Sequence, residues 1–308
     1  MRWLQQIADR FPVRKSAEQK QAFLKYAAAA ARKMGYAAHV EENGRHRNLV
    51  MGQPETAEVL FTAHYDTPAN KLIPSPIIPR NLPLFLLCQL ATVLLLFAVS
   101  FGAGYLSYLI TREPRLTLIV FLLCYFGLLL LLTAGPANKH NMNCNTSGVA
   151  AVLELMEQLP PEVRDQAAFI LFDNGETGRL GSRAYATRHQ QIKKRTLILN
   201  LDCVGVGDHL LFMVKNYARA TFAYRFLEES FADAEQLKTH WFPSSGCTFV
   251  SDHASFRCGV NVTACKRKKG IGFYTPHIHT RRDTEADARN IEELARCLVT
   301  FVKSVAAN

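Results

Sequence analysis

The sequence of 308 residues contains no Cys-x-x-Cys pair and no dense cysteine framework, although it has eight cysteines. This spacing favours reduced thiols and therefore a cytosolic compartment. The first residues, 1–6, also lack the apolar core of a secretory signal peptide, so we expect that the N-terminus is not exported. Outside one very apolar region there is no internal repeat and no low-complexity segment.

Acidic residues are fewer than basic ones, which leaves a formal net charge of +10. The sequence nevertheless has no arginine-rich helix with base-reading residues and no interleaving of basic and aromatic residues. Nucleic acid is therefore not an expected partner. A membrane surface or an acidic substrate would fit the positive charge better. The run Lys266 to Lys269 is either a contact with anionic lipid or a solvated turn.

Charged residues are completely absent from Asn81 to Thr111 and from Leu116 to Asn138. Each run exceeds the roughly 20 apolar residues that a helix needs to cross a bilayer. The connection between them is too short to hold a domain. We predict a transmembrane helical hairpin over residues 81–136, with spans at about 83–108 and 116–134. Two buried core helices are the alternative, and helices this long without a polar face are rare in soluble folds.

The flanking charges do not decide which side of the membrane carries the rest of the chain. Arg80 and Lys139 on one side are balanced by Arg112 and Arg115 on the other. The unpaired thiols and the missing signal peptide favour a multi-pass integral membrane protein whose main domain is cytoplasmic. A transporter or channel is a poor alternative, because two spans without charged residues offer no pathway unless the protein oligomerises.

Short apolar strands alternate with helices on both sides of the predicted hairpin. Residues 1–80 and 137–308 are therefore predicted to form one discontinuous domain. The expected fold is a three-layer α/β/α sandwich with a mostly parallel central sheet. Strands are expected at 36–41, 48–51, 59–63, 169–172, 196–201, 210–214 and 260–265, and helices at 16–34, 143–159, from 180, 221–231 and 290–307.

Five residues of ligand type lie where these elements end or begin. His64, Glu176 and Asp202 follow strands, whereas Cys144 and His279 lie at helix or loop starts. The carboxyl ends of strands in α/β sheets are where ligands are bound. Imidazole, carboxylate and thiolate together suit zinc. Each residue alone could be a helix cap, a solvated side chain or a core group, but five at element boundaries favour a metal site.

The order of the motifs resembles the di-zinc exopeptidases of metallopeptidase family twenty-eight, which include leucyl aminopeptidases, glutamate carboxypeptidase relatives and glutaminyl cyclases. That pattern is a His-x-Asp, an Asn-Asp-Asn-x-Ser-Gly, a Glu-Glu before Gly-x-x-Gly-Ser, an Asp after a strand and a late His-Thr. The matching stretches here are His64 to Asp66, Asn143 to Gly148, Gly175-Glu176 before Gly178 to Ser182, Asp202, and His279-Thr280, with Ser251 to His253 similar to a late substrate-side motif.

The resemblance implies one or two zinc ions. His64 and Asp202 would hold one ion, and Glu176 and His279 the other. Asp66 would orient His64 and fix its tautomer. Cys144 takes the place of the aspartate that bridges both metals in the family, and a thiolate can ligate or bridge zinc.

The glutamate that serves as general base in the family is missing, because Gly175 takes its place. Asp173 could substitute for it if the loop bends the carboxylate inward; the alternative is that Asp173 caps a helix or lies in a loop. His253 is a weaker substitute. A positioned base contributes roughly a hundredfold to ten-thousandfold to such a reaction.

The leading hypothesis is a membrane-anchored, zinc-dependent exopeptidase of the aminopeptidase type. Metal-bound hydroxide would hydrolyse the N-terminal peptide bond of a peptide substrate. Because the hairpin enters between two ligand motifs, the substrates are expected to be peptides at the membrane. The alternative is a catalytically impaired pseudoenzyme that acts as a zinc-stabilised binding module near the bilayer, since Cys144 and Gly175 are both damaging changes.

Overall fold

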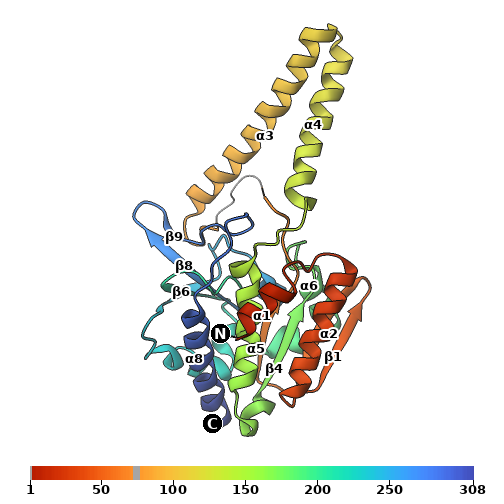
Figure 1. Ribbon diagram of the computed structural model, residues 1–308. Helices are drawn as coiled ribbons and strands as arrows, with labels where there is room; N and C mark the ends of the chain where they lie inside the picture. Colours follow the sequence, from red (N-terminus) through yellow and green to blue (C-terminus); the bar gives the residue numbers. More distant parts are fainter. Residues whose placement is uncertain (1, 72–76) are drawn as a thin grey trace.

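A computed structural model describes residues 2–71 and 77–308. One mixed sheet forms its centre, and two long helices project from one end (Figure 1). The strands are β1 (Ala38–Asn43), β2 (His46–Met51), β3 (Val59–His64), β4 (Ala167–Phe172), β5 (Leu197–Leu201), β6 (His209–Val214), β7 (Lys238–Pro243), β8 (Gly259–Lys268) and β9 (Gly272–Tyr274).

The order of strands across the sheet is β1-β2-β4-β3-β5-β8-β6-β7, and β9 pairs with β8. The four central strands, β4, β3, β5 and β8, run parallel to one another. The flanks are antiparallel where β2 meets β4 and where β8 meets β6. The predicted parallel sheet is therefore confirmed at its centre, where both faces of the strands are buried.

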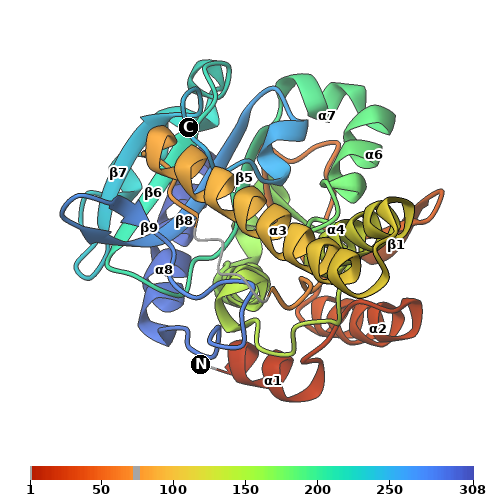
Figure 2. The same ribbon diagram turned by 90° about the horizontal axis from the view of Figure 1, so that it is seen from above.

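Helices cover both faces of the sheet, which gives the predicted three layers (Figure 2). One face packs against α1, α2, α5 and α8, and the other packs against α6 and α7. Side chains alternate along each strand, so Phe61 and Leu60 of β3 enter opposite layers. The helices are α1 (Arg2–Arg10), α2 (Ala17–Lys33), α3 (Leu82–Thr111), α4 (Pro114–Ala134), α5 (Gly148–Gln158), α6 (Leu180–Arg188), α7 (Gln190–Arg195) and α8 (Ala288–Ala306).

Local sequence explains where the main helices begin. Ser16 caps α2 through a capping box with Gln19. Asn81 accepts a hydrogen bond from the Leu84 amide at the start of α3, and Asp287 accepts one from Arg289 at the start of α8. These side chains satisfy backbone amides that the helix itself leaves unpaired.

One predicted helix is wrong. Residues 221–231 form two short 3₁₀ turns instead, at Ala223–Phe226 and Glu229–Phe231, and a third precedes them at Ala218–Ala220. The buried residues Tyr224, Leu227 and Phe231 recur at intervals of three and four, and this spacing suits either kind of helix. The backbone closes the shorter hydrogen bonds, for example from the Leu227 amide to the Tyr224 carbonyl.

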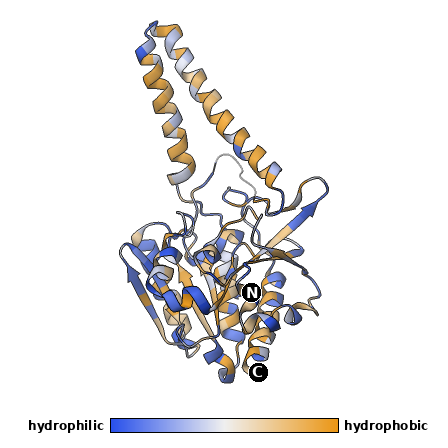
Figure 3. Ribbon diagram, turned by 180° about the vertical axis from the view of Figure 1, so that it is seen from behind, coloured by the Kyte–Doolittle hydropathy of each residue, from blue (hydrophilic) through white to orange (hydrophobic). Residues whose placement is uncertain are grey.

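The helices α3 and α4 pack against each other and extend away from the sheet (Figures 1 and 3). They contain 30 and 21 residues, and most of their large apolar side chains are exposed. Gly104 allows close approach, since a Cβ there would meet Phe121 of α4 at 3.2 Å. Both helices are long and apolar enough to cross a membrane.

Candidate metal centre

The five candidate ligands converge at one edge of the sheet, although they come from separate parts of the chain. His64 is the last residue of β3, and Asp202 follows β5 directly. Glu176 lies in the loop after β4. Because these strands are parallel, their carboxyl ends meet at the same edge. Cys144 and His279 reach this edge from the segment before α5 and from the loop before α8.

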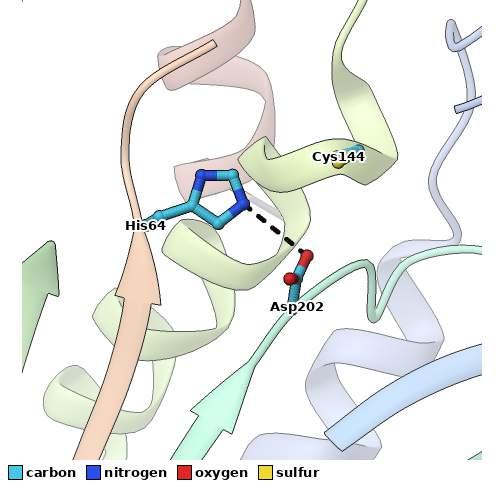
Figure 4. Close-up of side chains that lie close together, drawn as sticks. All are labelled: His64, Cys144 and Asp202. Atoms are coloured by element: carbon cyan, nitrogen blue, oxygen red, sulfur yellow. Dashed lines mark ion pairs between the residues drawn. The ribbon is translucent and has the colours of Figure 1, made fainter. Parts of the chain in front are cut away.

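Two groups of potential ligand atoms share Cys144. His64, Cys144 and Asp202 form the first group, shown in Figure 4. Cys144, Glu176 and His279 form the second, and within each group the ligand atoms lie within 4.8 Å of one another. His64 Nε2 is 3.7 Å from Asp202 Oδ1. Cys144 Sγ is 3.1 Å from His279 Nε2 and 3.4 Å from Glu176 Oε1. The thiol therefore occupies the position between the two groups.

The Asp66 carboxylate contacts His64 of the first group and the loop that carries Glu176 of the second group. Its Oδ1 lies 3.2 Å from His64 Nδ1 and accepts a hydrogen bond from the Gly175 amide at 2.7 Å. Its Oδ2 accepts a hydrogen bond from the Glu176 amide at 3.2 Å. The carboxylate thus orients the His64 ring and the loop that carries Glu176. Ser251 similarly donates a hydrogen bond to Asp202.

Asp283 is a buried residue of the site that the sequence analysis missed. Its carboxylate accepts hydrogen bonds from the amides of Asn143 and Cys144, at 2.8 and 3.1 Å. Burial raises the pKa of Asp283 to about 7. The backbone around Cys144 is not helical, and the peptide bond between Cys144 and Asn145 is cis. The position of Asp283 four residues after His279 was the available signal in the sequence.

Electrostatics couple the members of the second group. Burial is the largest single influence on Glu176 and His279 and opposes charge on both, but the attraction between them, together with interactions with other neighbours, outweighs it. The net effect lowers the pKa of Glu176 to about 2 and raises the pKa of His279 to about 10. A metal ion at His279 therefore has to displace a proton.

The same competition affects the first group. Burial opposes charge on His64, but hydrogen bonds with Asp202 and Asp66 raise its pKa well above the ordinary value. A hydrogen bond with the neighbouring Cys203 thiol, together with burial, raises the pKa of Cys144 well above the ordinary value. A bound metal would reverse this effect, because a coordinated thiol loses its proton.

The structure does not bring Asp173 into either group, contrary to the expectation that its carboxylate could replace the missing base. Asp173 Oδ1 forms a buried ion pair with Lys20 Nζ at 2.6 Å. Its Oδ2 accepts the Arg47 amide at 3.1 Å. Both oxygens are therefore used in holding β2 and α2 to the end of β4. His253 is also buried, and burial lowers its pKa to about 3.

Gly175 lies directly against His64. A Cβ built at Gly175 would be 2.4 Å from both Cβ and Cγ of His64, far inside normal contact. The loop therefore leaves no space for a side chain at the position where the family pattern has glutamate. His64 itself takes that space.

The donors fit zinc in type and arrangement. Each group supplies three ligands chosen from imidazole, thiolate and carboxylate, and three protein ligands with one open position are typical of catalytic zinc. His64 Nδ1 contacts the Asp66 carboxylate, as expected of a zinc-binding histidine. His279 Nδ1 is buried and has no hydrogen-bond partner in the described part of the chain.

A cavity of about 240 Å³ opens onto both groups. Ile77, Phe249 and Val250 are its large apolar lining residues, and Arg179 also lines it. A second cavity, of about 360 Å³, reaches Asp66 and Glu176 from the side of α4, where Leu132 and Thr133 line it. The second cavity thus reaches the site close to the end of α4.

The profile of Peptidase family M28 matches residues 135–302, more than half of the chain. The chain belongs to this family. The match covers Cys144, Glu176, Asp202 and His279, whereas His64 lies outside it. No curated protein matches the sequence.

Solved structures show that this M28 chain has the fold of zinc-dependent exopeptidases. A Zn-dependent exopeptidase from Parabacteroides distasonis superposes with a TM-score of 0.60 at 14% identity, covering 97% of this chain and 95% of the other. Porphyromonas gingivalis glutaminyl cyclase gives 0.58 at 15% identity, with coverages of 98% and 96%. Legionella pneumophila LapA aminopeptidase gives 0.58 at 13% identity, with coverages of 99% and 72%.

Proposed function

We propose that this M28 protein is a membrane-anchored, zinc-dependent exopeptidase of the aminopeptidase type. The observation that carries the proposal is the convergence of two three-residue ligand groups on Cys144, at the carboxyl ends of parallel strands. Its peptide substrate would enter the cavity of about 240 Å³ beside these groups.

His64 and Asp202 would hold one zinc ion, Glu176 and His279 a second, and Cys144 would contact one or both. Zinc, when bound, would supply a Lewis acid for the scissile carbonyl and lower the pKa of a water molecule to about 7.

The chain's own residues would prepare this chemistry. Asp66 would keep His64 in the tautomer whose Nε2 faces the metal, because Nδ1 is held by the carboxylate. The apolar lining residues Ile77, Phe249 and Val250 would exclude water from the substrate side chain.

We further propose that residues 81–136 form a transmembrane hairpin inserted into one discontinuous domain, residues 1–80 and 137–308. The exposure of most of the large apolar side chains on α3 and α4 supports this arrangement. The exopeptidase domain would lie on the cytoplasmic side, in keeping with its unpaired thiols. Peptides at the membrane surface are the expected substrates, since Leu132 and Thr133 of α4 line the second cavity.

The test uses zinc-loaded, detergent-purified full-length protein and a panel of aminoacyl amides, together with a peptide that begins with glutamine. Glu176→Ala is the control variant, and zinc content is measured in parallel. Amide hydrolysis that disappears in Glu176→Ala would support the aminopeptidase. Cyclisation of the glutamine peptide without amide hydrolysis would instead assign glutaminyl cyclase chemistry. Protein that takes up no zinc would refute the proposal.

A second candidate is a zinc-stabilised binding module without hydrolytic activity. It is favoured by the lack of a carboxylate that could act as general base: Gly175 has no side chain and lies against His64, and the Asp173 carboxylate is paired with Lys20. Retained zinc with no turnover of any substrate in the panel would support this second function over the first.

A further inference from the structure

The outer end of β8 and the short strand β9 form a basic hairpin, residues 266–274. Lys266, Arg267, Lys268 and Lys269 follow one another along it, and all four are exposed. Lys266 pairs with Tyr274 and Lys268 with Gly272, so the hairpin is a hydrogen-bonded element and not a loose loop. It concentrates four positive charges at one protruding tip.

These charges have no compensation within the described residues. None of the four basic side chains forms an ion pair there, and Arg267 instead lies over the Phe273 ring, 5.4 Å from its centroid. The sequence contains no Asp or Glu between Asp252 and Asp283. The positive charge of the hairpin is therefore exposed and available to an anionic partner outside the described residues.

The hairpin is attached to the start of α3. Asn81, which caps α3, donates a hydrogen bond from Nδ2 to the Ile271 carbonyl at 3.0 Å. The Thr275 amide donates to the Ile77 carbonyl, also at 3.0 Å. Figure 1 shows the β8–β9 hairpin beside the lower end of α3, and Figure 3 shows its hydrophilic character next to the apolar helix.

An aromatic contact strengthens this attachment. The Arg80 guanidinium lies 4.6 Å from the centroid of the Phe242 ring, which in turn is 5.9 Å from the ring of Phe273 in β9. Arg80 itself is exposed and directly precedes the helix cap. If α3 enters a bilayer at Asn81, the hairpin is held at the depth of the lipid headgroups.

We propose that the basic hairpin binds the headgroups of anionic phospholipids and fixes the exopeptidase domain against the membrane. This inference rests on the proposed membrane anchoring of α3 and α4, but not on catalytic activity. A basic segment next to a membrane-spanning helix is attracted to anionic lipid, whereas zwitterionic lipid offers it no net charge. The attraction falls with salt, because the Debye length is only about 8 Å at physiological ionic strength.

The experiment compares full-length protein in lipid nanodiscs made of phosphatidylcholine alone with nanodiscs that also contain phosphatidylglycerol. Hydrogen exchange of the turn amides at residues 269–271 is the readout. The test variant changes all four basic residues of the hairpin to Gln. The control variant removes the same charge from exposed lysines of the domain: Lys25→Gln, Lys33→Gln, Lys194→Gln and Lys303→Gln.

We expect phosphatidylglycerol to slow exchange at the turn by on the order of tenfold in the parent and in the control variant. The hairpin variant should show no slowing, and high salt should abolish it in the parent. Equal exchange in both lipids, or equal slowing in the hairpin variant, would overturn the proposal. If inorganic phosphate slowed exchange of the turn amides in phosphatidylcholine nanodiscs, the ligand would be phosphate in general and the proposal of a lipid ligand would be wrong.

Extraction of the parent protein from native membranes at alkaline pH separates the two proposals. Release into the soluble fraction would refute membrane anchoring and with it the lipid contact. Retention in the membrane together with lipid-independent exchange would refute the lipid contact alone.

Discussion

Replacing Gly175 with Ala should weaken zinc binding without any change to a candidate ligand. The added Cβ would lie 2.4 Å from two carbons of His64, whereas carbon atoms in contact are normally about 3.5 to 4.0 Å apart. Either the imidazole or the loop must therefore move by about 1 Å. His64 is held between Asp66 and Asp202, so movement of its ring would disturb the first ligand group.

The magnitude follows from the cost of overpacking a buried site. Inserting a methyl group into such a site costs about 1 to 3 kcal/mol. If this cost is paid in the zinc-bound state, zinc affinity should fall by roughly fivefold to 150-fold. Competition with a chromophoric chelator at neutral pH, on detergent-purified protein, measures this change. Gly175→Glu should likewise gain no activity, because its side chain would displace His64.

Gly178→Ala is the matched control. A Cβ at Gly178 would meet no heavy atom within 4 Å, so His64 should be undisturbed. Its positive φ of 75° makes the substitution cost about 1 kcal/mol of folding stability. Zinc affinity in this variant should stay at the parent value. Parent-like zinc affinity in Gly175→Ala would show that the loop does not press on His64, and the argument would fail.

Three further predictions concern buried ionisable groups. Burial raises the pKa of Asp252 from 3.8 to about 6, and its carboxylate has no well-formed hydrogen bond with the described residues. The charged carboxylate therefore lowers the free energy of unfolding by its full amount above pH 6, by less between pH 6 and pH 3.8, and not at all below pH 3.8. Asp252→Asn should therefore raise stability by about 3 kcal/mol at neutral pH, with the gain vanishing in acid, as followed by denaturation at several pH values; an equal gain at every pH would contradict this. Asp283→Ala should leave the buried amides of Asn143 and Cys144 unpaired and lower the free energy of unfolding by about 2 to 4 kcal/mol. It should also speed hydrogen exchange of the Cys144 amide, and unchanged exchange there would contradict the role of Asp283. Because the pKa of His279 is raised to about 10, zinc affinity should increase by at least about tenfold per pH unit through the neutral range, and a flat profile would show that His279 is not a ligand.

Most of the fold could be predicted because its signals are local. The buried run Phe169 to Phe172 is apolar on both faces, as a central parallel strand requires, and it is fully buried in β4. The long uncharged runs likewise became α3 and α4, with boundaries within a few residues of the predicted spans. The segment 221–231 failed because intervals of three and four do not distinguish an α-helix from successive 3₁₀ turns.

The candidate ligands could also be identified from the sequence, since each lies at the boundary of an element. The residues that surround the ligands, and the directions of their side chains, could not be predicted from it. Asp173 directly follows its strand, as a catalytic acid at this sheet edge would, but the direction of its side chain depends on Lys20, which is far away in the sequence. Asp283 was indicated only by its position four residues after His279, because a carboxylate that accepts backbone amides has no sequence pattern of its own.

The sequence by itself determined most of the elements and which ligand-type side chains lie at their ends, because strand and helix periodicity and motif order are properties of neighbouring residues. Only the tertiary structure decided that Cys144 lies between two ligand groups, that His64 packs directly against Gly175, and that the basic hairpin is attached to the start of α3. These features are contacts between residues distant in the chain. Packing and hydrogen bonding set them together, and no local pattern encodes them.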